Sequence, residues 1–246
     1  CRKDCKSIQM MGLKEDICFN EGRKMMSRKK MRMLFKIILG FPKSLFLNLY
    51  YFPLSKALKF PIIVTSNLKI GSLGKRGNVV VDNPYKRIFI GYGEAFALGK
   101  KNSYWEIGNN ASVIFKGKAT FGAGIQFICT GKMTIGDNFY CNGDCILNAG
   151  KRIEIGNDFL CGWNCEILDG DGHFILYNGE RKENYSEVEI GEHVWVASGV
   201  TVLKGSRISD GSIVAAKSCI SKKIEQKNVL IGRNNEILRT NVSWEK

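Results

Sequence analysis

The sequence feature that most constrains the fold is an aliphatic residue at every sixth position near the C-terminal end of the chain. This series consists of Ile190, Val196, Val202, Ile208, Val214 and Ile220. A second series of small or β-branched residues lies four positions after each of the first five: Val194, Val200, Ser206, Ser212 and Ser218. A period of six fits neither an α-helix, with about 3.6 residues per turn, nor a β-strand, with about 2. Because such a unit is too short to bury its own apolar side chains, we expect the units to stack around one shared core.

Three units would make one triangular coil of about 18 residues, with the aliphatic side chain inside and successive coils paired as parallel strands. The same phrase recurs upstream at Ile90, Ile107, Ile135 and Ile155, so the solenoid is expected to start near residue 65. Between Ile155 and Ile190 the chain has about 17 residues more than one coil needs. This surplus predicts an excursion loop over residues 169–187, and such loops on a regular scaffold often carry function.

The sequence therefore predicts one all-β domain with extensions. A basic leader over residues 1–30 is a candidate for disorder, and an apolar and amphipathic segment follows over 31–64. The β-helix occupies 65–230 and a C-terminal cap 231–246. The 27 glycines against 4 prolines agree with frequent tight corners.

The positive charge is concentrated at the N-terminal end. Residues 1–36 contain 11 Lys or Arg and 4 Asp or Glu, which accounts for half of the net charge of +14. No base-stacking or groove-binding motif accompanies this charge, so nucleic acid is not expected as a partner. A basic segment followed by apolar residues is more typical of a surface that meets anionic lipid.

The nine cysteines are expected to be reduced, because their number is odd and no stretch has the order of a secretory signal. The spacing Cys141-x3-Cys145 and Cys161-x3-Cys165 suggests a metal site, but structural zinc sites usually have two-residue gaps. In the coil register, Cys141 stacks on Cys161 and Cys145 on Cys165. Packed core thiols are therefore favoured, and no metal is expected.

The stretch from Ile190 to Val202, IGEHVWVASGVTV, continues in register to Lys222 and is preceded by the loop sequence Asp-Gly-Asp-Gly-His173. These motifs resemble the hexapeptide-repeat acyltransferase superfamily, particularly galactoside/maltose-type, xenobiotic and surface-polysaccharide O-acetyltransferases. The resemblance covers residues 65–246. It implies a left-handed parallel β-helix with a helical or irregular N-terminal extension and a short C-terminal helix, the latter within 234–246. It also implies a homotrimer of parallel prisms, with acetyl-CoA in the cleft between neighbours.

The resemblance further implies that a loop histidine acts as the base, and His173 occupies that position. Imidazole suits proton transfer near neutral pH. Asp169 and Asp171 are candidates for orienting it, although either could instead shape a turn with the neighbouring glycines. His193, the other histidine, is expected to be a solvated surface residue.

The remaining site residues follow from the same resemblance. The backbone N–H of Ser198 matches the oxyanion donor and Asn142 the acceptor-side asparagine, although each could be an ordinary corner residue. An exposed tryptophan is unusual on a soluble prism, and Trp195 matches the one beside the pantetheine arm. Four further matches to CoA-binding positions are Ala216, Ser221, Lys222 and Arg239. The closing Gly-Asn-Pro-Ala-Lys phrase of the family is replaced here by residues 232–236, GRNNE.

The apolar segment over residues 33–64 contains no uncharged run of the ~20 residues that a spanning helix requires. Pro42 and Pro53 are also expected to interrupt it. Two interpretations remain: two short amphipathic pieces that lie on the inner face of the membrane, or a cap that buries the open edge of the first coil.

The expected function is acetyl-CoA-dependent O-acetylation of a sugar hydroxyl in a cell-surface polysaccharide or oligosaccharide precursor. The expected location is cytoplasmic, with residues 31–60 as the candidate for peripheral membrane contact. A xenobiotic (antibiotic) O-acetyltransferase is the nearest alternative, since scaffold and donor would be the same. A non-catalytic scaffold or glycan-binding module is the alternative from another class. A γ-type carbonic anhydrase would need three histidines, and the chain has two.

Overall fold

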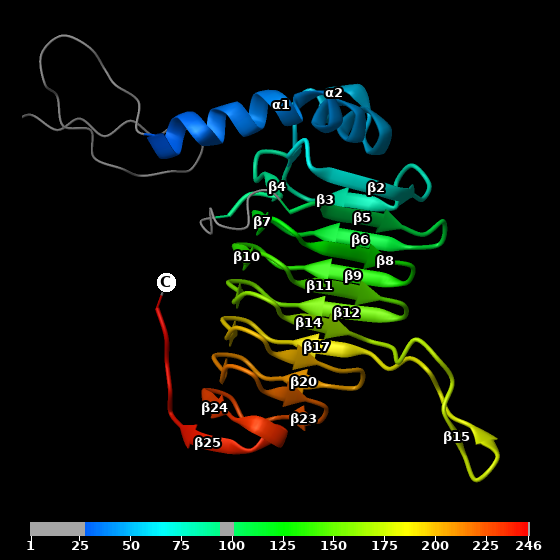
Figure 1. Cartoon of the computed structure of the whole chain (residues 1–246), viewed down its shortest axis with the longest axis vertical. Helices are drawn as coiled ribbons and strands as arrows, with labels where there is room; N and C mark the ends of the chain where they lie inside the picture. Colours follow the sequence, from blue (N-terminus) through cyan, green and yellow to red (C-terminus); the bar gives the residue numbers. More distant parts are fainter. Residues whose placement is uncertain (1–27, 94–100, 246) are drawn as a thin grey trace, which may run out of the picture.

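The strands form three parallel sheets that wrap the chain into a triangular prism (Figure 1). The computed structural model describes residues 28–93 and 101–245, with side chains from residue 31 onward. Residues 1–27 of the predicted basic leader lie outside the described residues. We number the three sides of the prism in the order in which the chain visits them, and name each edge by the two faces that it joins.

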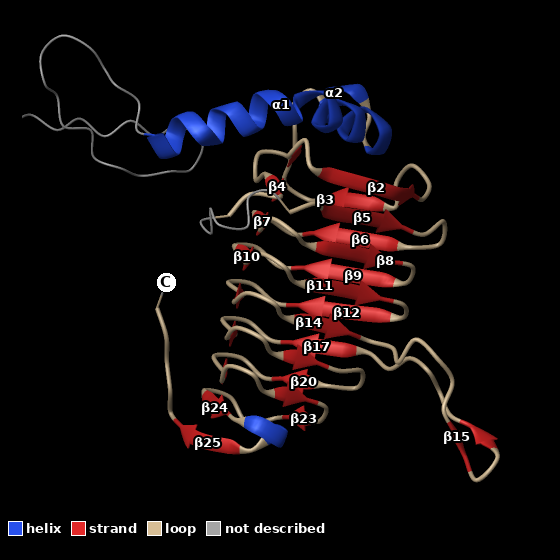
Figure 2. Cartoon of the chain, in the orientation of Figure 1, coloured by secondary structure: helices blue, strands red, loops and turns tan. Residues whose placement is uncertain are grey.

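Face 1 consists of β1 (Ile62–Val64), β4 (Ile88–Ile90), β7 (Ala119–Phe121), β10 (Phe139–Cys141), β13 (Leu160–Cys161), β18 (Trp195–Val196), β21 (Ile213–Val214) and β24 (Val229–Ile231). Face 2 consists of β2 (Leu68–Leu73), β5 (Ser103–Ile107), β8 (Gln126–Cys129), β11 (Ile146–Ala149), β14 (Glu166–Leu168), β19 (Thr201–Val202) and β22 (Cys219–Ile220). Face 3 consists of β3 (Val79–Val81), β6 (Ser112–Phe115), β9 (Lys132–Ile135), β12 (Arg152–Ile155), β17 (Val188–Ile190), β20 (Arg207–Ile208) and β23 (Lys223–Ile224). Each chain passage through the three faces completes one coil (Figure 2).

The six-residue register predicted from the sequence is confirmed. All six members of the series from Ile190 to Ile220 are buried, none more than 3% exposed. Ile155 pairs with Ile190 across the predicted surplus, and Cys141 pairs with Cys161. The apolar side chains of every coil therefore meet along the prism axis, where they form one continuous core.

Polar residues in the left-handed backbone region allow the sharp edges. At edge 1–2 such residues include Asp144 and Asn164, with φ of 59° and 53°, and at edge 3–1 they include Asn138 and Asp158, with φ of 57° and 56°. Asn and Asp tolerate this conformation because their short side chains can bond locally. The chain can therefore turn at each edge without a glycine at every coil.

The N-terminal segment differs from the prediction of two short pieces. Helix α1 (Arg28–Tyr51) is continuous for 24 residues with Pro42 inside it, and α2 (Leu54–Ala57) follows Pro53. Within α1, Met31–Tyr51 is long and apolar enough to cross a membrane by length and composition. The second half of the helix instead packs across the end of the prism, and this packing offsets the backbone bond that Pro42 cannot make (Figure 1).

Helix α1 caps the open edge of the first coil, as one of the two interpretations of this segment predicted. The side-chain amide of Asn48 donates to Ile62 O (2.6 Å) and its carbonyl accepts from Ile62 N (3.1 Å). Ser44 Oγ accepts from Val64 N at 3.0 Å. Gly40 permits this approach, since a Cβ there would lie 1.9 Å from Val64 O. The backbone groups of β1 that no strand can pair are thus bound by helix side chains.

We expect Asn48→Leu to lower the free energy of unfolding by about 3 kcal/mol, because two buried backbone groups of Ile62 lose their partners. Asn48 is fully buried, so water cannot replace the amide. Urea denaturation followed by circular dichroism measures the change. The matched control is Asn110→Leu at an exposed turn, which should change stability by less than about 0.5 kcal/mol. Equal stabilities of the two variants would contradict the capping role.

The C-terminal end differs from the predicted helix over 234–246. A single 3-10 turn (Arg233–Asn235) is followed by strand β25 (Ile237–Thr240), which pairs antiparallel with β24. Asn234 and Asn235 both have positive φ, at 60° and 67°, and this conformation stops a helix from propagating. The cap of the last coil is therefore mainly a reversed strand.

Candidate functional site

The excursion loop leaves the prism at edge 2–3, between β14 and β17. It extends outward as a small antiparallel hairpin, β15 (Leu176–Tyr177) and β16 (Glu180–Arg181) (Figure 1). The apolar residues near its tip are 52–69% exposed within a single chain: Phe174, Ile175, Leu176 and Tyr177. The hairpin has almost no contact with its own prism, so these side chains are available to a neighbouring surface.

Asp169 anchors the base of the loop, which fits the turn-shaping alternative for this residue rather than the orientation of His173. Its carboxylate accepts hydrogen bonds from the backbone N–H groups of Gly150 (2.7 Å), Lys151 (2.8 Å) and Arg152 (2.6 Å). The residue is 1% exposed. Three charge-assisted bonds to the turn of the preceding coil occupy both carboxylate oxygens, so Asp169 positions the loop rather than the imidazole.

Asp171 lies one turn further along, where its carboxylate forms an ion pair with Lys204 at 2.5 Å. Lys204 also donates to Glu183 O at 2.7 Å, so it ties both arms of the loop to the next coil. Within the described residues, no hydrogen bond joins Asp171 to His173. The orienting role of Asp171 therefore stays a prediction that would require a rearrangement when substrates bind.

His173 is exposed on the outer arm of the loop. No hydrogen bond or ion pair to its ring is present among the described parts of the chain. An imidazole in this position can meet only groups that come from outside its own prism or from a bound substrate.

A second group of predicted residues gathers at edge 1–2. Asn142 lies there on one coil, Gly162 on the next, Ser198 on the third and Ala216 on the fourth, following the ladder β10, β13, β18 and β21. The N–H of Ser198 makes no hydrogen bond to any other described residue. Gly162 keeps it open, because a Cβ at that position would lie 2.6 Å from Ser198 N. An unpaired N–H at a turn is the type of donor that can stabilise an oxyanion.

Trp195 lies on face 1 just before this edge, 37% exposed. The ring of Trp244, from the C-terminal tail, lies beside it with the two ring centroids 6.3 Å apart. His193 lies at the surface as predicted, with its side chain 42% exposed, but its ring also has partners in the chain. His193 Nδ1 bonds Asp158 Oδ2 at 2.5 Å, and the ring stacks on Trp244 with centroids 4.2 Å apart. His193 thus fastens the tail to edge 3–1.

The predicted CoA residues divide between the two groups. Ser221 and Lys222 lie at edge 2–3, on the same edge as the loop, where Asn235 Oδ1 accepts from both backbone N–H groups at 2.7 and 3.2 Å. Ala216 lies at edge 1–2. Arg239 lies on β25, and its guanidinium bonds Leu238 O at 2.8 Å. The sequence thus selected two edges of the prism rather than one pocket.

The whole width of face 2 separates His173 from Ser198 in one chain. From Ser198 to Lys204 the backbone crosses this face in six residues, or roughly 15–20 Å of extended chain. A proton acceptor and an oxyanion donor must both lie within about 3 Å of the reacting atoms. The two groups can act together only if edge 2–3 of one chain meets edge 1–2 of another.

Comparison with known proteins identifies the scaffold. No family model matches the chain. It is 39% identical over 66 residues to the polysialic acid O-acetyltransferase of Neisseria meningitidis, covering 26% of this chain and 31% of that protein. It is 28% identical over 127 residues to the galactoside O-acetyltransferase of Escherichia coli strain K12, covering 43% and 63%. The chain thus spans less than two thirds of either relative.

Among solved structures, the polySia-specific acetyltransferase NeuO matches with a TM-score of 0.55 and 17% identity, over 74% of this chain and 90% of that one. The chain is thus similar in sequence to O-acetyltransferases and shares the fold of this solved acetyltransferase. The predicted fold class, a left-handed parallel β-helix, is confirmed.

One exposed residue beside the site was missed in the sequence. Trp163 is 49% exposed at edge 1–2, and its backbone N–H donates to Ser198 Oγ at 3.3 Å. The same part of the turn in the preceding coil is occupied by the small residues Gly143 and Asp144, so a bulky tryptophan there departs from the corner pattern. This departure is the sequence signal that could have identified Trp163. Trp163 therefore lies at the same edge as Ser198 on the preceding coil, and Trp195 lies on the strand that leads into that edge.

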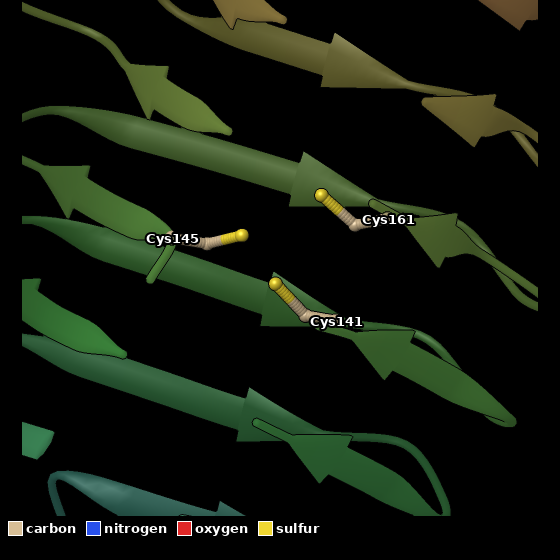
Figure 3. A group of neighbouring side chains, drawn as sticks. All are labelled: Cys141, Cys145 and Cys161. Carbon is tan, nitrogen blue, oxygen red and sulfur yellow. The ribbon is translucent and has the colours of Figure 1, made fainter. Parts of the chain in front are cut away.

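The cysteines of adjacent coils form a buried cluster inside the prism. The Sγ atoms of Cys141, Cys145 and Cys161 all lie within 4.8 Å of one another and point toward a common centre (Figure 3). Cys145 Sγ donates to Gly162 O at 3.1 Å and Cys165 Sγ donates to Ala197 O at 3.1 Å. Hydrogen bonds to neighbouring thiols, together with burial, raise the pKa of Cys161 well above its usual range. The contacts of Cys145 and Cys165 with backbone carbonyls fit the packed-thiol interpretation, while the absence of a metal stays a prediction.

Proposed function

We propose that this protein is an acetyl-CoA-dependent O-acetyltransferase that acts on a sugar hydroxyl of a cell-surface polysaccharide or oligosaccharide precursor. The observation that carries the proposal is the presence of two complementary half-sites on different edges of one prism. Edge 2–3 has the loop with an imidazole that is unpaired within the described residues, and edge 1–2 has an open N–H with exposed Trp163 at the same edge and Trp195 on the adjoining strand. The two relatives are named for O-acetyl transfer to polysialic acid and to galactosides.

The proposed assembly is a homotrimer with parallel axes, in which edge 2–3 of each chain lies against edge 1–2 of the next. This arrangement joins His173 of one chain to Ser198 and Trp195 of its neighbour, and it covers the exposed hairpin tip. Lys222 lies on the loop edge, where a cation suits the phosphates of CoA. Trp195 offers an aromatic surface for the pantetheine arm.

In the proposed reaction, the imidazole of His173 takes the proton of the acceptor hydroxyl while that oxygen attacks the thioester carbonyl. The Ser198 N–H donates to the negative oxygen of the tetrahedral intermediate. Collapse of the intermediate breaks the C–S bond, and the imidazolium returns its proton to the leaving CoA sulfur. The acetyl group is thereby transferred to the sugar oxygen and CoA leaves as the free thiol, with no metal required at any step.

A xenobiotic acceptor is the second candidate, because it would use the same half-sites. It differs in the acceptor alone, and the sugar-directed relatives favour a glycan.

The test is release of free thiol from acetyl-CoA by the purified protein, measured with a thiol-reactive dye against a panel of acceptors. The panel contains oligosialic acid, galactosides, lipid-linked oligosaccharides and hydroxylated antibiotics. We expect acceptor-dependent release with at least one glycan, and mass spectrometry should show one added acetyl group. Release with an antibiotic alone would establish the xenobiotic alternative. No binding of CoA by calorimetry and no release with any acceptor would leave the scaffold as the correct function.

A further inference from the structure

Helix α1 carries an apolar stripe on the side that faces away from the prism. The stripe is made of side chains that are each 41–60% exposed and lie three, four or eight residues apart: Met31, Phe35, Ile38, Phe46 and Leu49. Leu34, Leu39 and Phe41 border it at 46–49% exposed, and Leu54 of α2 and Leu58 extend it at 63% and 62%. Such spacing places the residues along one face of a helix.

The opposite side of the same helix is fully engaged. Gly40, Ser44, Leu47, Asn48 and Tyr51 are buried against the first coil. Met33 and Ile37 pack on the small outer cluster of Ile63, Phe89 and Tyr92. The helix is therefore fixed in place by its inner face, and the outward direction of the apolar stripe is set by the fold.

The charge along this surface has one sign. Residues 28–57 contain seven Lys or Arg and no Asp or Glu. On a helical projection, Arg32, Lys36 and Lys43 follow one another along the flank of the apolar stripe, at spacings of four and seven residues. Lys36 is partly buried, and this burial lowers its pKa, while Lys43 donates to Ser66 O and Leu68 O at 2.6 Å. An apolar stripe with a cationic flank is the pattern of a helix that lies in the headgroup region of an anionic bilayer.

We propose that the outer face of α1 and α2 docks the protein on an anionic lipid bilayer, with α1 lying in the plane of the interface. A spanning orientation would strip Asn48 and Ser44 from the backbone of β1 and place them in hydrocarbon. The lying orientation keeps these bonds and buries only the side chains that are exposed in the folded chain.

The helix lies across the end of the stack of coils, so the bilayer would face the N-terminal end of the prism (Figure 1). On face 1, β1 and β18 are separated by five ladder steps, or about 24 Å at about 4.8 Å per step. If the proposed function holds, the half-site at Ser198 would stand about 24 Å beyond β1, and α1 would lie between β1 and the headgroups. That height suits an acceptor sugar presented on a lipid carrier rather than the carrier itself.

The test is flotation of the full chain with vesicles of phosphatidylcholine, with and without about one quarter phosphatidylglycerol. We expect binding to the anionic vesicles, weaker binding to the neutral ones, and weakening as salt rises. The double variant Phe35→Gln/Ile38→Gln should bind at least about ten-fold more weakly, because two large apolar side chains no longer enter the interface. Ile237→Gln/Leu238→Gln is the matched control, since both side chains are exposed, at 39% and 40%, on β25 at the opposite end of the prism, and it should bind as the unaltered chain does.

The second measurement is the molar mass in solution of the unaltered chain and the double variant. Unchanged mass with reduced flotation supports lipid docking. A lower mass for the double variant would overturn the proposal in favour of an interface between copies of the chain, and equal flotation of both would overturn it outright. Neither measurement uses acetyl-CoA or an acceptor, so their outcome is independent of whether acetyl transfer is found.

Discussion

Replacing His173 with alanine is expected to lower the rate of acetyl transfer by about three orders of magnitude and to leave the prism intact. A positioned general base contributes 10²–10⁴-fold to a reaction of this kind, as an order of magnitude. The side chain is exposed and makes no hydrogen bond within the described residues, so its removal should not alter folding. Steady-state thiol release measures the rate, and circular dichroism and thermal unfolding measure the fold.

The other histidine supplies the control. His193→Ala breaks the contact with Asp158 and the stacking on Trp244, so it should lower the melting temperature while changing the rate by only a few-fold. Rates that fall equally in both variants would refute His173 as the base.

Mixing chains separates the two half-sites. His173→Ala and Trp195→Ala chains, unfolded together and refolded, should recover part of the activity that neither has alone. In the mixed assembly, some interfaces would pair the intact His173 of a Trp195→Ala chain with the intact Trp195 of a His173→Ala chain. Absence of recovery, with mixed oligomers demonstrated by mass spectrometry, would contradict a site shared between chains.

Asp169→Ala should produce the second large effect, with a loss of about 3 kcal/mol in the free energy of unfolding. The substitution leaves the N–H groups of Gly150, Lys151 and Arg152 without their acceptor. Asp169→Asn should lose nearly as much, because an amide NH₂ would face backbone donors. Acetyl transfer should also fall in both variants, since the loop that carries His173 loses its anchor.

Asp171→Asn is the matched comparison on the same loop. Its ion pair with Lys204 is partly exposed, at 30% and 25%, so losing it should change stability by less than about 1 kcal/mol. Hydrogen exchange at residues 150–152 would show whether the difference arises at the turn. If Asp169→Ala were no less stable than Asp171→Asn, the anchoring role would be refuted.

The repeat register could be predicted because a period of six has one structural solution, and it placed residues 190–220 and the paired cysteines correctly. The partner of Asp169 could not be predicted, since the acceptor and its three donors are separated by 17 to 19 residues and meet only when coils stack. The continuity of α1 through Pro42 also depends on a distant surface, the edge of β1. The C-terminal strand was missed because the left-handed conformations of Asn234 and Asn235 are not visible in a helix-compatible sequence.

The sequence identified the candidate site residues, but it did not predict where on the prism each of them lies. A one-dimensional match assigns Asn142, His173 and Ser198 to one reaction, yet it contains no information on which edge each occupies. The edge that each residue occupies follows only from the assignment of every strand to one of the three faces of its coil. The exposed Trp163 could have been selected by its size at a corner position, but its relation to Ser198 requires the register of two adjacent coils.

The side-chain cap that Asn48 and Ser44 place on β1 has a consequence for how such a chain can change in length. Growth at that end is blocked, because an added strand would find no free donors or acceptors to join. Whole coils can be gained or lost only within the body of the stack, between the helix and the reactive edges. Each such event would shift the height of the reaction centre by one fixed increment while leaving both ends as they are, so the molecule is built as an adjustable spacer.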